Sequence, residues 1–194
     1  MLVLASNSSI RAQLLRNAGV AFSVHPAHVD EESLIASLVA ENENPRAISD
    51  VLAEYKARQV SGVADGYILG TDQTLECDGQ LYQKVTTRED AHVILTQLQG
   101  RAHKLHSAAV LYENANPVWR IVRTATLEMR SLSDKDIDQY LSKACPDCLN
   151  SVGCYQLENI GVNLFHRIDG DYFTILGLPL LDILGFLRLR GLIT

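Results

Sequence analysis

Apolar residues along the chain follow two spacings, and each predicts a different kind of element. Short continuous runs such as 1–5 and 67–69 are typical of buried strands, whereas recurrence every three or four residues, as in 10–18, is typical of helices. The expected strands are 1–5, 22–25, the strand containing 67–69, the hairpin 75–81, 101–112, 118–130 and 164–168. The expected helices are 10–18, 33–41, 45–60, 87–98, 133–143 and a leucine-rich segment from 178. This mixture of strands and helices predicts an α/β fold.

Turn-forming residues and caps set several of the boundaries. Asp78-Gly79 predicts a two-residue hairpin turn, and residues 113–117 predict a longer turn between two long strands. The apolar stripe of the expected helix 45–60 consists of Ile48, Val51, Leu52 and Tyr55. The stretch 144–161 is irregular and rich in small residues, and such a stretch inside a compact domain is often functional.

Composition and charge narrow the range of functions. A hydrophobic content of 47% over 194 residues suffices for one domain spanning residues 1–194. The net charge of -6 argues against binding polymeric nucleic acid, which needs a large positive field. No apolar run approaches the length of a membrane span, and no basic secretory leader is visible, so no membrane contact, a cytoplasmic location and free thiols are expected. The pair Cys145 and Cys148 could form a metal or redox site, but inert thiols are the simpler interpretation.

Asp72 is the first candidate for chemistry. It follows the apolar run 67–69 and Gly70. Ligand sites in open α/β sheets lie at the carboxyl ends of buried strands, which favours a site there. A strand-end acid can equally cap a turn, so this position alone leaves both roles open.

The N-terminal strand, polar turn and helix form a second candidate. Serines in such a turn direct hydroxyl and N–H groups at a possible anion, although ordinary N-capping by Ser8 or Ser9 explains the same residues. Arg11 lies in the first helical turn, where a cation is unfavourable for the helix dipole. This placement favours an anion that is brought in from outside.

Two lysines have roles that the residues alone leave open. Lys56 lies beside the apolar stripe of its helix and could reach the Asp72 site or remain a solvated surface group. Lys84 follows the return strand of the hairpin and could bind phosphate or form a salt bridge. The phosphate-binding loops G-x-x-x-x-G-K-[ST] and G-x-G-x-x-G are both absent.

Short segments in a specific order carry a family resemblance. They are Leu4-Ala5-Ser6-Asn7-Ser8-Ser9-Ile10-Arg11, Val29-Asp30-Glu31, Glu54-Tyr55-Lys56-Ala57, Gly70-Thr71-Asp72-Gln73, Lys84, Gly100-Arg101-Ala102-His103, Gly153-Cys154-Tyr155-Gln156-Leu157-Glu158 and Gly177-Leu178-Pro179-Leu180. Together they cover nearly the whole chain, which resembles the Maf-like (septum formation inhibitor) nucleoside triphosphate pyrophosphatases.

The resemblance implies a fold and a reaction. The fold would be an elongated mixed sheet with flanking helices and two lobes around a deep nucleotide cleft, and homodimers are common in this family. The reaction would be house-cleaning hydrolysis of a nucleoside triphosphate between its α- and β-phosphates, with a divalent cation, Mg²⁺ or Mn²⁺. Asp72 would be the general base, and both Asp72 and Glu31 would bind the metal. The phosphate ligands would be Ser6, Ser8, Arg11, Lys56 and Lys84.

Three further positions bear on the base of the nucleotide. Members that prefer pyrimidines carry arginine, threonine and glutamine where this chain has Ile10, Gln73 and Glu158. The Asp-Gln pair and the glutamate are similar to the branch that prefers 7-methyl-GTP, in which tryptophan usually occupies the Ile10 position. A carboxylate can accept both donors of the Watson–Crick edge of guanine, so a guanine-like base is expected.

A second functional class fits part of the sequence. The chain could be a nucleotide-sensing regulator of cell division in which hydrolysis is weak or incidental. A pure sensor has no need of a general base, and the presence of Asp72 beside several cationic candidates therefore favours the enzyme.

Overall fold

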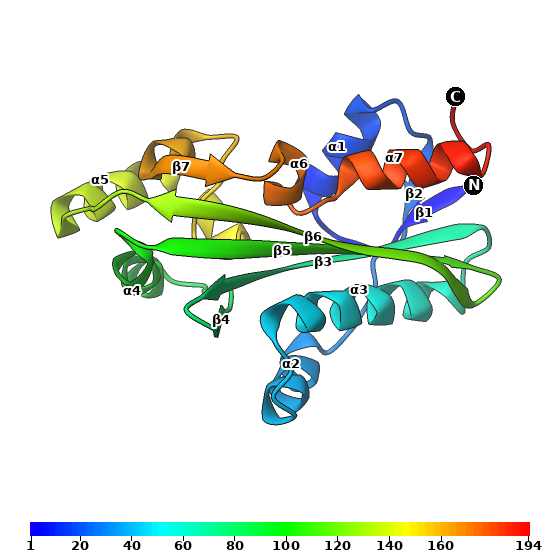
Figure 1. Ribbon diagram of the computed structural model, residues 1–194, viewed down its shortest axis with the longest axis horizontal. Helices are drawn as coiled ribbons and strands as arrows, with labels where there is room; N and C mark the ends of the chain where they lie inside the picture. The colour runs from blue at the N-terminus through cyan, green and yellow to red at the C-terminus, as the bar shows by residue number, and fades with distance from the viewer.

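A seven-stranded mixed sheet runs along the molecule in the computed structural model, which describes residues 1–194 (Figure 1). The strands are β1 (Leu2–Leu4), β2 (Phe22–Val24), β3 (Tyr67–Cys77), β4 (Gln80–Tyr82), β5 (Ala102–Glu113), β6 (Asn116–Met129) and β7 (Phe165–Asp169). The helices are α1 (Ser9–Asn17), α2 (Glu31–Ala40), α3 (Pro45–Ser61), α4 (Arg88–Leu98), α5 (Asp134–Ala144), α6 (Tyr172–Ile175) and α7 (Leu180–Leu189). No helix combines the length and apolar character needed to cross a membrane.

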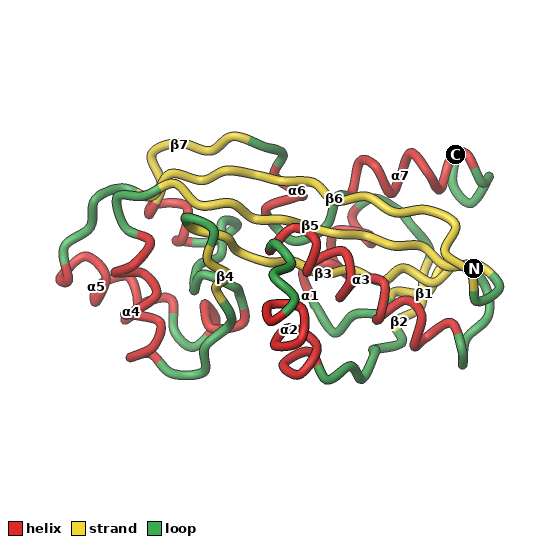
Figure 2. The backbone as a smooth tube through the Cα atoms, turned by 60° about the horizontal axis from the view of Figure 1, so that its bottom comes forward, coloured by secondary structure: helices red, strands yellow, loops and turns green.

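The sheet combines parallel and antiparallel pairing. Its strand order is β2-β1-β3-β5-β6-β7, with β4 paired to the far end of β3. The pairs β1–β2 and β1–β3 are parallel, and the remaining pairs are antiparallel. Figure 2 shows β3, β5 and β6 as long strands that extend through the middle of the molecule.

Helices cover both faces of the sheet. In Figure 1, α3 lies below the sheet, whereas α1, α6 and α7 lie above it. Alternation along β1 follows from the pleat. Val3 joins the apolar cluster between the sheet and α3, while Leu2 and Leu4 join the larger cluster on the opposite face. A residue's position along a strand therefore decides which layer of helices its side chain meets.

A gap in strand pairing interrupts one edge of β3. On that edge β1 pairs with residues 67–69 and β4 pairs with residues 75–77, so residues 70–74 have no strand partner there. On the other edge all five residues pair with β5. At a rise of about 3.3 Å per residue the gap is about 17 Å long. We call these residues, 70–74, the β3 gap.

Most of the sequence-predicted elements are confirmed, with two corrections. The Asp78-Gly79 turn has positive φ at both residues, as a type I′ hairpin requires. The turn predicted at 113–117 is shorter, because Asn114 and Ala115 alone adopt positive φ and residues 116 and 117 already belong to β6. The short helix α6 was not predicted, because a polar Asp171 cap before only one turn of helix resembles a simple turn.

Candidate active site

Asp72 lies in the middle of the β3 gap and is almost fully buried. It is therefore a residue within a long strand, and it does not cap a turn. Its carboxylate accepts a hydrogen bond from the ammonium of Lys56, which also forms an ion pair with Glu31 at 2.8 Å (Nζ to Oε1). One ammonium thus joins the two carboxylates that the sequence singled out.

The placement of Lys56 follows from how closely α3 packs on β3. A Cβ on Gly70 would lie 2.6 Å from the amide nitrogen of Ala57 and 2.8 Å from its Cβ, so the helix rests directly on the glycine. Small residues on both elements permit this approach, and Lys56, with only 10% of its side chain exposed, reaches Asp72 from α3.

The predicted apolar stripe of this helix is corrected by the same packing. Tyr55 is 45% exposed and lies off the buried face, whereas Lys56 lies on that face. The buried positions of α3 are Pro45, Ile48, Ser49, Leu52, Ala53, Lys56, Ala57 and Val60. A pattern based on large apolar residues missed this face because alanines and a lysine form much of it.

Ser6, Ser8 and Arg11 follow β1 at one end of the β3 gap. The Ser6 hydroxyl oxygen accepts hydrogen bonds from the Ser8 amide at 3.2 Å and from Nη1 of Arg11 at 3.3 Å. The Ser8 hydroxyl oxygen accepts the Arg11 amide and so caps α1, which confirms the capping interpretation for that residue. The structure therefore brings all three residues to one corner of the site.

Arg11 is held in place by backbone carbonyls of two other segments. Its Nε donates to the carbonyl of Gly177 at 2.8 Å, and its Nη1 donates to the carbonyl of Thr71 at 3.1 Å. Burial lowers the pKa of Arg11, and the nearby charges of Asp72 and Glu31 act in the opposite direction. The guanidinium remains a cation, since the ordinary pKa of arginine is far above neutrality.

Lys84 approaches the same site from the segment that follows β4. It forms no ion pair, so the salt-bridge alternative is not realised. Although Lys84 is exposed, desolvation by the surrounding protein lowers the pKa of its ammonium, and the charge of Arg11 lowers it further. The negative charges of Asp72 and Glu31 raise the pKa of Lys84 and so partly offset this lowering. Arg11 and Lys84 are therefore close enough to repel, and an anion between them would relieve that repulsion.

The side chain of Gln73 lies on the opposite face of the sheet from Asp72. Its amide nitrogen donates to the hydroxyl of Ser107 at 2.9 Å and to the carbonyls of Thr174 at 3.1 Å and Ile175 at 3.0 Å. Adjacent residues of a strand point to opposite faces, which explains this separation. The role of Gln73 in reading the base stays a prediction, but its amide hydrogens are already engaged.

Ile10 and Glu158 are not brought into contact with Asp72. Ile10 is partly buried against the larger apolar cluster, and Glu158 is an exposed residue between two short 3₁₀ turns, Asp147–Asn150 and Ile160–Leu164. The Glu158 carboxylate forms no hydrogen bond within the protein. The predicted contacts of both residues with a base stay predictions.

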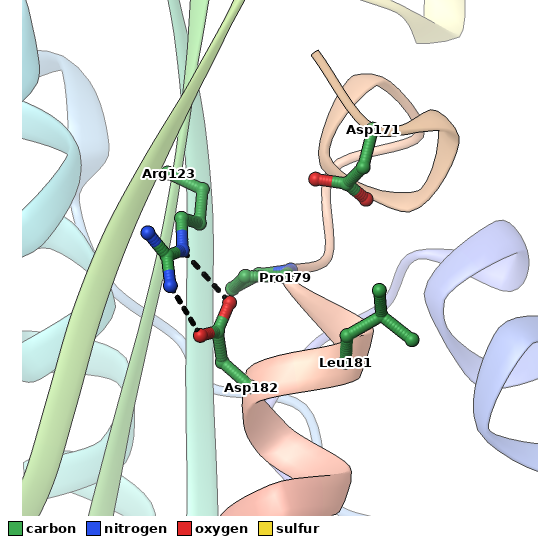
Figure 3. Close-up of a pocket in the computed structure, with 5 residues that line it drawn as sticks. All are labelled: Arg123, Asp171, Pro179, Leu181 and Asp182. Carbon is green, nitrogen blue, oxygen red and sulfur yellow. Dashed lines mark hydrogen bonds and ion pairs between the residues drawn. The ribbon is translucent and has the colours of Figure 1, made fainter.

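A hollow in the surface lies away from the β3 gap. It has a volume of about 300 Å³ and is lined by Arg123, Asp171, Pro179, Leu181 and Asp182 (Figure 3). Arg123 is paired with Asp182 through two hydrogen bonds, of 2.9 and 2.6 Å, as the dashed lines in Figure 3 show. Its only cation is thus neutralised, and the remaining acid, Asp171, would repel a phosphate. This hollow is therefore poorly suited to a phosphate.

Sequence reasoning missed two residues that support the site. Ser107 is fully buried on β5 opposite Gln73, and the carbonyl of Gly177 receives Arg11. Gly177 begins the segment Gly177-Leu178-Pro179-Leu180 that carries part of the family resemblance, and this is the signal that could have identified it. Nothing in the sequence marks Ser107, because its importance depends on a cross-strand pairing.

Known proteins resemble this chain over nearly its whole length. The family model described as "Maf-like protein" matches residues 1–190. A "Nucleoside triphosphate pyrophosphatase" from Ruegeria pomeroyi is 50% identical over 99% of this chain and 97% of its own length. "Nucleoside triphosphate pyrophosphatase 1" from Jannaschia sp. is 49% identical over 99% of this chain and 98% of its own length. A "7-methyl-GTP pyrophosphatase" from Rhizobium meliloti is 45% identical over 100% of this chain and 98% of its own length.

A structural comparison gives a weaker match. A HAM1 protein from Coxiella burnetii aligns with 66% of this chain and 72% of its own, at 18% identity and a TM-score of 0.40. This similarity is too low to bear on function, whereas the family model spans almost every residue discussed above. The chain belongs to the Maf-like protein family.

Proposed function

We propose that this protein hydrolyses a nucleoside triphosphate between the α- and β-phosphates, giving the nucleoside monophosphate and pyrophosphate. One observation carries the proposal. The buried carboxylate of Asp72 lies in the β3 gap, where it forms an ion pair with Lys56 and has the cations of Arg11 and Lys84 nearby. The names of the relatives support the same reaction class. No specific observation favours the alternative of a sensor with little hydrolysis.

The residues of the gap divide the work of hydrolysing a phosphoanhydride. Arg11, Lys56 and Lys84 supply positive charge against the phosphates, and such preorganised charge is commonly the largest contribution to this kind of catalysis. Asp72 accepts a proton from the attacking water, and positioned general bases contribute about 10²- to 10⁴-fold to the rate. Ser6 offers a hydroxyl at the edge of the same region.

A divalent cation, Mg²⁺ or Mn²⁺, fits the donor set at Glu31 and Asp72. Both carboxylates contact the same ammonium, and no group of three or more His, Cys, Asp or Glu residues suited to a metal occurs in the structure. Mg²⁺ is usually bound by one or two carboxylates together with substrate phosphates and water, so two are enough. When bound, the cation would neutralise phosphate charge.

The base of the substrate is proposed to be guanine-like. The support is the carboxylate of Glu158, which can accept the two adjacent donors of guanine and would meet an acceptor on uracil or thymine. Glu158 is exposed and forms no side-chain hydrogen bond, so it is available for such a contact. Ile10 would supply an apolar surface beside the base.

Product analysis tests the reaction. The protein is incubated with Mg²⁺ and a panel of nucleoside triphosphates, including 7-methyl-GTP, and the products are separated by ion-exchange chromatography. We expect monophosphate and pyrophosphate. Diphosphate and orthophosphate would contradict the proposed cleavage, and nucleotide binding without turnover would favour the sensor.

The role of Asp72 is tested by Asp72→Asn, which keeps the size of the side chain and removes its basicity. We expect turnover to fall by about 10²- to 10⁴-fold while nucleotide binding persists. Asp65→Asn is the matched control, because Asp65 is an exposed acid in the loop before β3. An Asp72→Asn protein with full turnover would remove Asp72 as the base.

A further inference from the structure

The turn after α6 is fastened to the sheet by side chains from β3 and β5. The carbonyl of Thr174 accepts the Gln73 amide at 3.1 Å and the Ser107 hydroxyl at 2.7 Å. Gln73 also donates to the carbonyl of Ile175 and to the Ser107 oxygen. Thr174 and Ser107 are fully buried, so these bonds are shielded from competing water.

The turn itself is tightly constrained. The amide of Gly177 donates to the carbonyl of Thr174 at 3.1 Å, and the amide of Leu178 donates to the carbonyl of Phe173 at 3.0 Å. These two bonds, with φ of +91° at Gly177, form the Schellman motif that ends many helices. At the start of α6, the carboxylate of Asp171 accepts the Thr174 amide at 2.9 Å. A displacement of Thr174 would therefore move Gly177 with it.

Arg11 rests on this turn. Its Nε donates to the carbonyl of Gly177, and a Cβ on Gly177 would lie 3.3 Å from both Nε and Nη2. A larger residue here would therefore push the guanidinium back by a few tenths of an ångström and would be strained at this φ. With Nη1 bound to Ser6 and Thr71, the Nη2 group is the part of Arg11 that has no acceptor in the protein.

We propose that Gln73 and Ser107 are positioning residues for Arg11, acting through the turn that carries Gly177. This inference rests on the proposed function, in which Arg11 binds substrate phosphate. The Gln73 amide has two hydrogens, and both are used within the protein by the three acceptors it faces. Gln73 therefore sets how firmly phosphates are held for every nucleotide, and it does not donate to the base.

A double-mutant cycle with Arg11 tests this coupling. Gln73→Ala and Ser107→Ala should each raise KM by about three- to tenfold, the range of one hydrogen bond, by the same factor for guanine and pyrimidine nucleotides. In an Arg11→Ala background, Gln73→Ala should have no further effect. Gln139→Ala, at an exposed glutamine on α5, is the control that should leave KM unchanged. Additive losses from Arg11 and Gln73 would overturn the proposal, and so would a changed order of nucleotide preference.

Gln73→Glu adds a readout that a purely structural role would not produce. A carboxylate at this position would face the carbonyls of Thr174 and Ile175 and repel them, whereas its protonated form could donate one hydrogen bond. The KM of this variant, relative to wild type at each pH, should fall as pH is lowered. A ratio that does not change with pH would count against the proposal.

Binding of inorganic tripolyphosphate, measured by calorimetry, separates this inference from the proposed reaction. Gln73→Ala should weaken tripolyphosphate binding by the same factor as it raises KM, and this can be measured even if the wild-type protein turns over no nucleotide. Unchanged tripolyphosphate affinity in the folded variant would overturn the positioning role. Absence of turnover in the wild-type protein would instead contradict only the proposed function. Urea denaturation of each variant confirms that it is folded.

Discussion

Gly70→Ala tests whether the contact between α3 and β3 sets the position of Lys56. An added Cβ would lie 2.6 Å from the amide nitrogen of Ala57, and the carbonyl of Ala53 would be closer still. Ordinary contact begins near 3.4 Å, so the helix must recede by about 0.8 Å or more. These neighbours are backbone atoms, which cannot give way unless the whole helix moves.

The movement has two measurable consequences. Overpacking of this kind costs about 1–3 kcal/mol, and contact with backbone atoms places Gly70→Ala near the upper end, at about 3 kcal/mol. For a protein of this size that is a fall in Tm of about 6–12 °C. Because Lys56 moves with the helix, away from Asp72, we expect turnover to fall by about a hundredfold, the effect of a 1 Å misplacement.

The assay combines urea denaturation with turnover under identical buffer conditions. Gly185→Ala is the control: a Cβ there meets no atom within 4 Å, and alanine in the interior of α7 should add about 0.5–1 kcal/mol of stability. Combining Gly70→Ala with Ala57→Gly should not restore the protein, because backbone contacts remain. A Gly70→Ala protein that loses less than about 1 kcal/mol and keeps its turnover would refute this reasoning.

Further predictions concern the thiols, the buried histidine and the base. Iodoacetamide at pH 8 should modify Cys145 before Cys148 and Cys154 in peptide mass spectra, because burial raises the pKa of Cys154 to about 12 and also raises that of Cys148; equal rates would contradict this. Burial lowers the pKa of His103 to about 4, below its unfolded value, so its contribution to stability is complete above pH 6.5 and is lost as pH falls towards 4. The stability lost should reach roughly 3 kcal/mol, and the urea midpoints of wild type and His103→Gln should converge at low pH. A difference between the midpoints that stays constant with pH would argue against this role of His103. Glu158→Gln should lower the preference for guanine over pyrimidine nucleotides in competition assays, and an unchanged ranking would remove Glu158 from base recognition.

Local patterns predicted the elements well where one residue type decides the conformation. Asp78-Gly79 formed the expected hairpin turn because the required positive φ favours those residues. The end of β5 was less predictable. Asn114 and Ala115 both adopt positive φ, and Pro117 is tolerated in β6. A proline is usually a sign of a strand boundary, and here the pairing of two long strands outweighs that preference.

The site was predictable only in part, because sequence order does not show which layer a side chain enters. Asp72 and Lys56 were identified, and the structure joins them. Gln73 was grouped with its neighbour Asp72, although the strand directs it to the opposite face, where Ser107 meets it. Such cross-strand partners lie far apart in sequence and have no local signature. The role of Tyr55 was misjudged because aromatic residues were counted as core, whereas small residues form the close contact.

The β3 gap has a consequence for product release. Arg11 follows β1, which pairs at one end of the gap, and Lys84 follows β4, which pairs at the other. The continuous pairing of β3 with β5 holds these two ends of β3 in one rigid strand. A triphosphate bound by both Arg11 and Lys84, as proposed, would be a bivalent ligand, and its second contact would benefit from a high effective concentration. The proposed hydrolysis would divide it into two monovalent fragments. The same rigid spacing that strengthens substrate binding would therefore weaken the hold on both products as soon as the bond is cut.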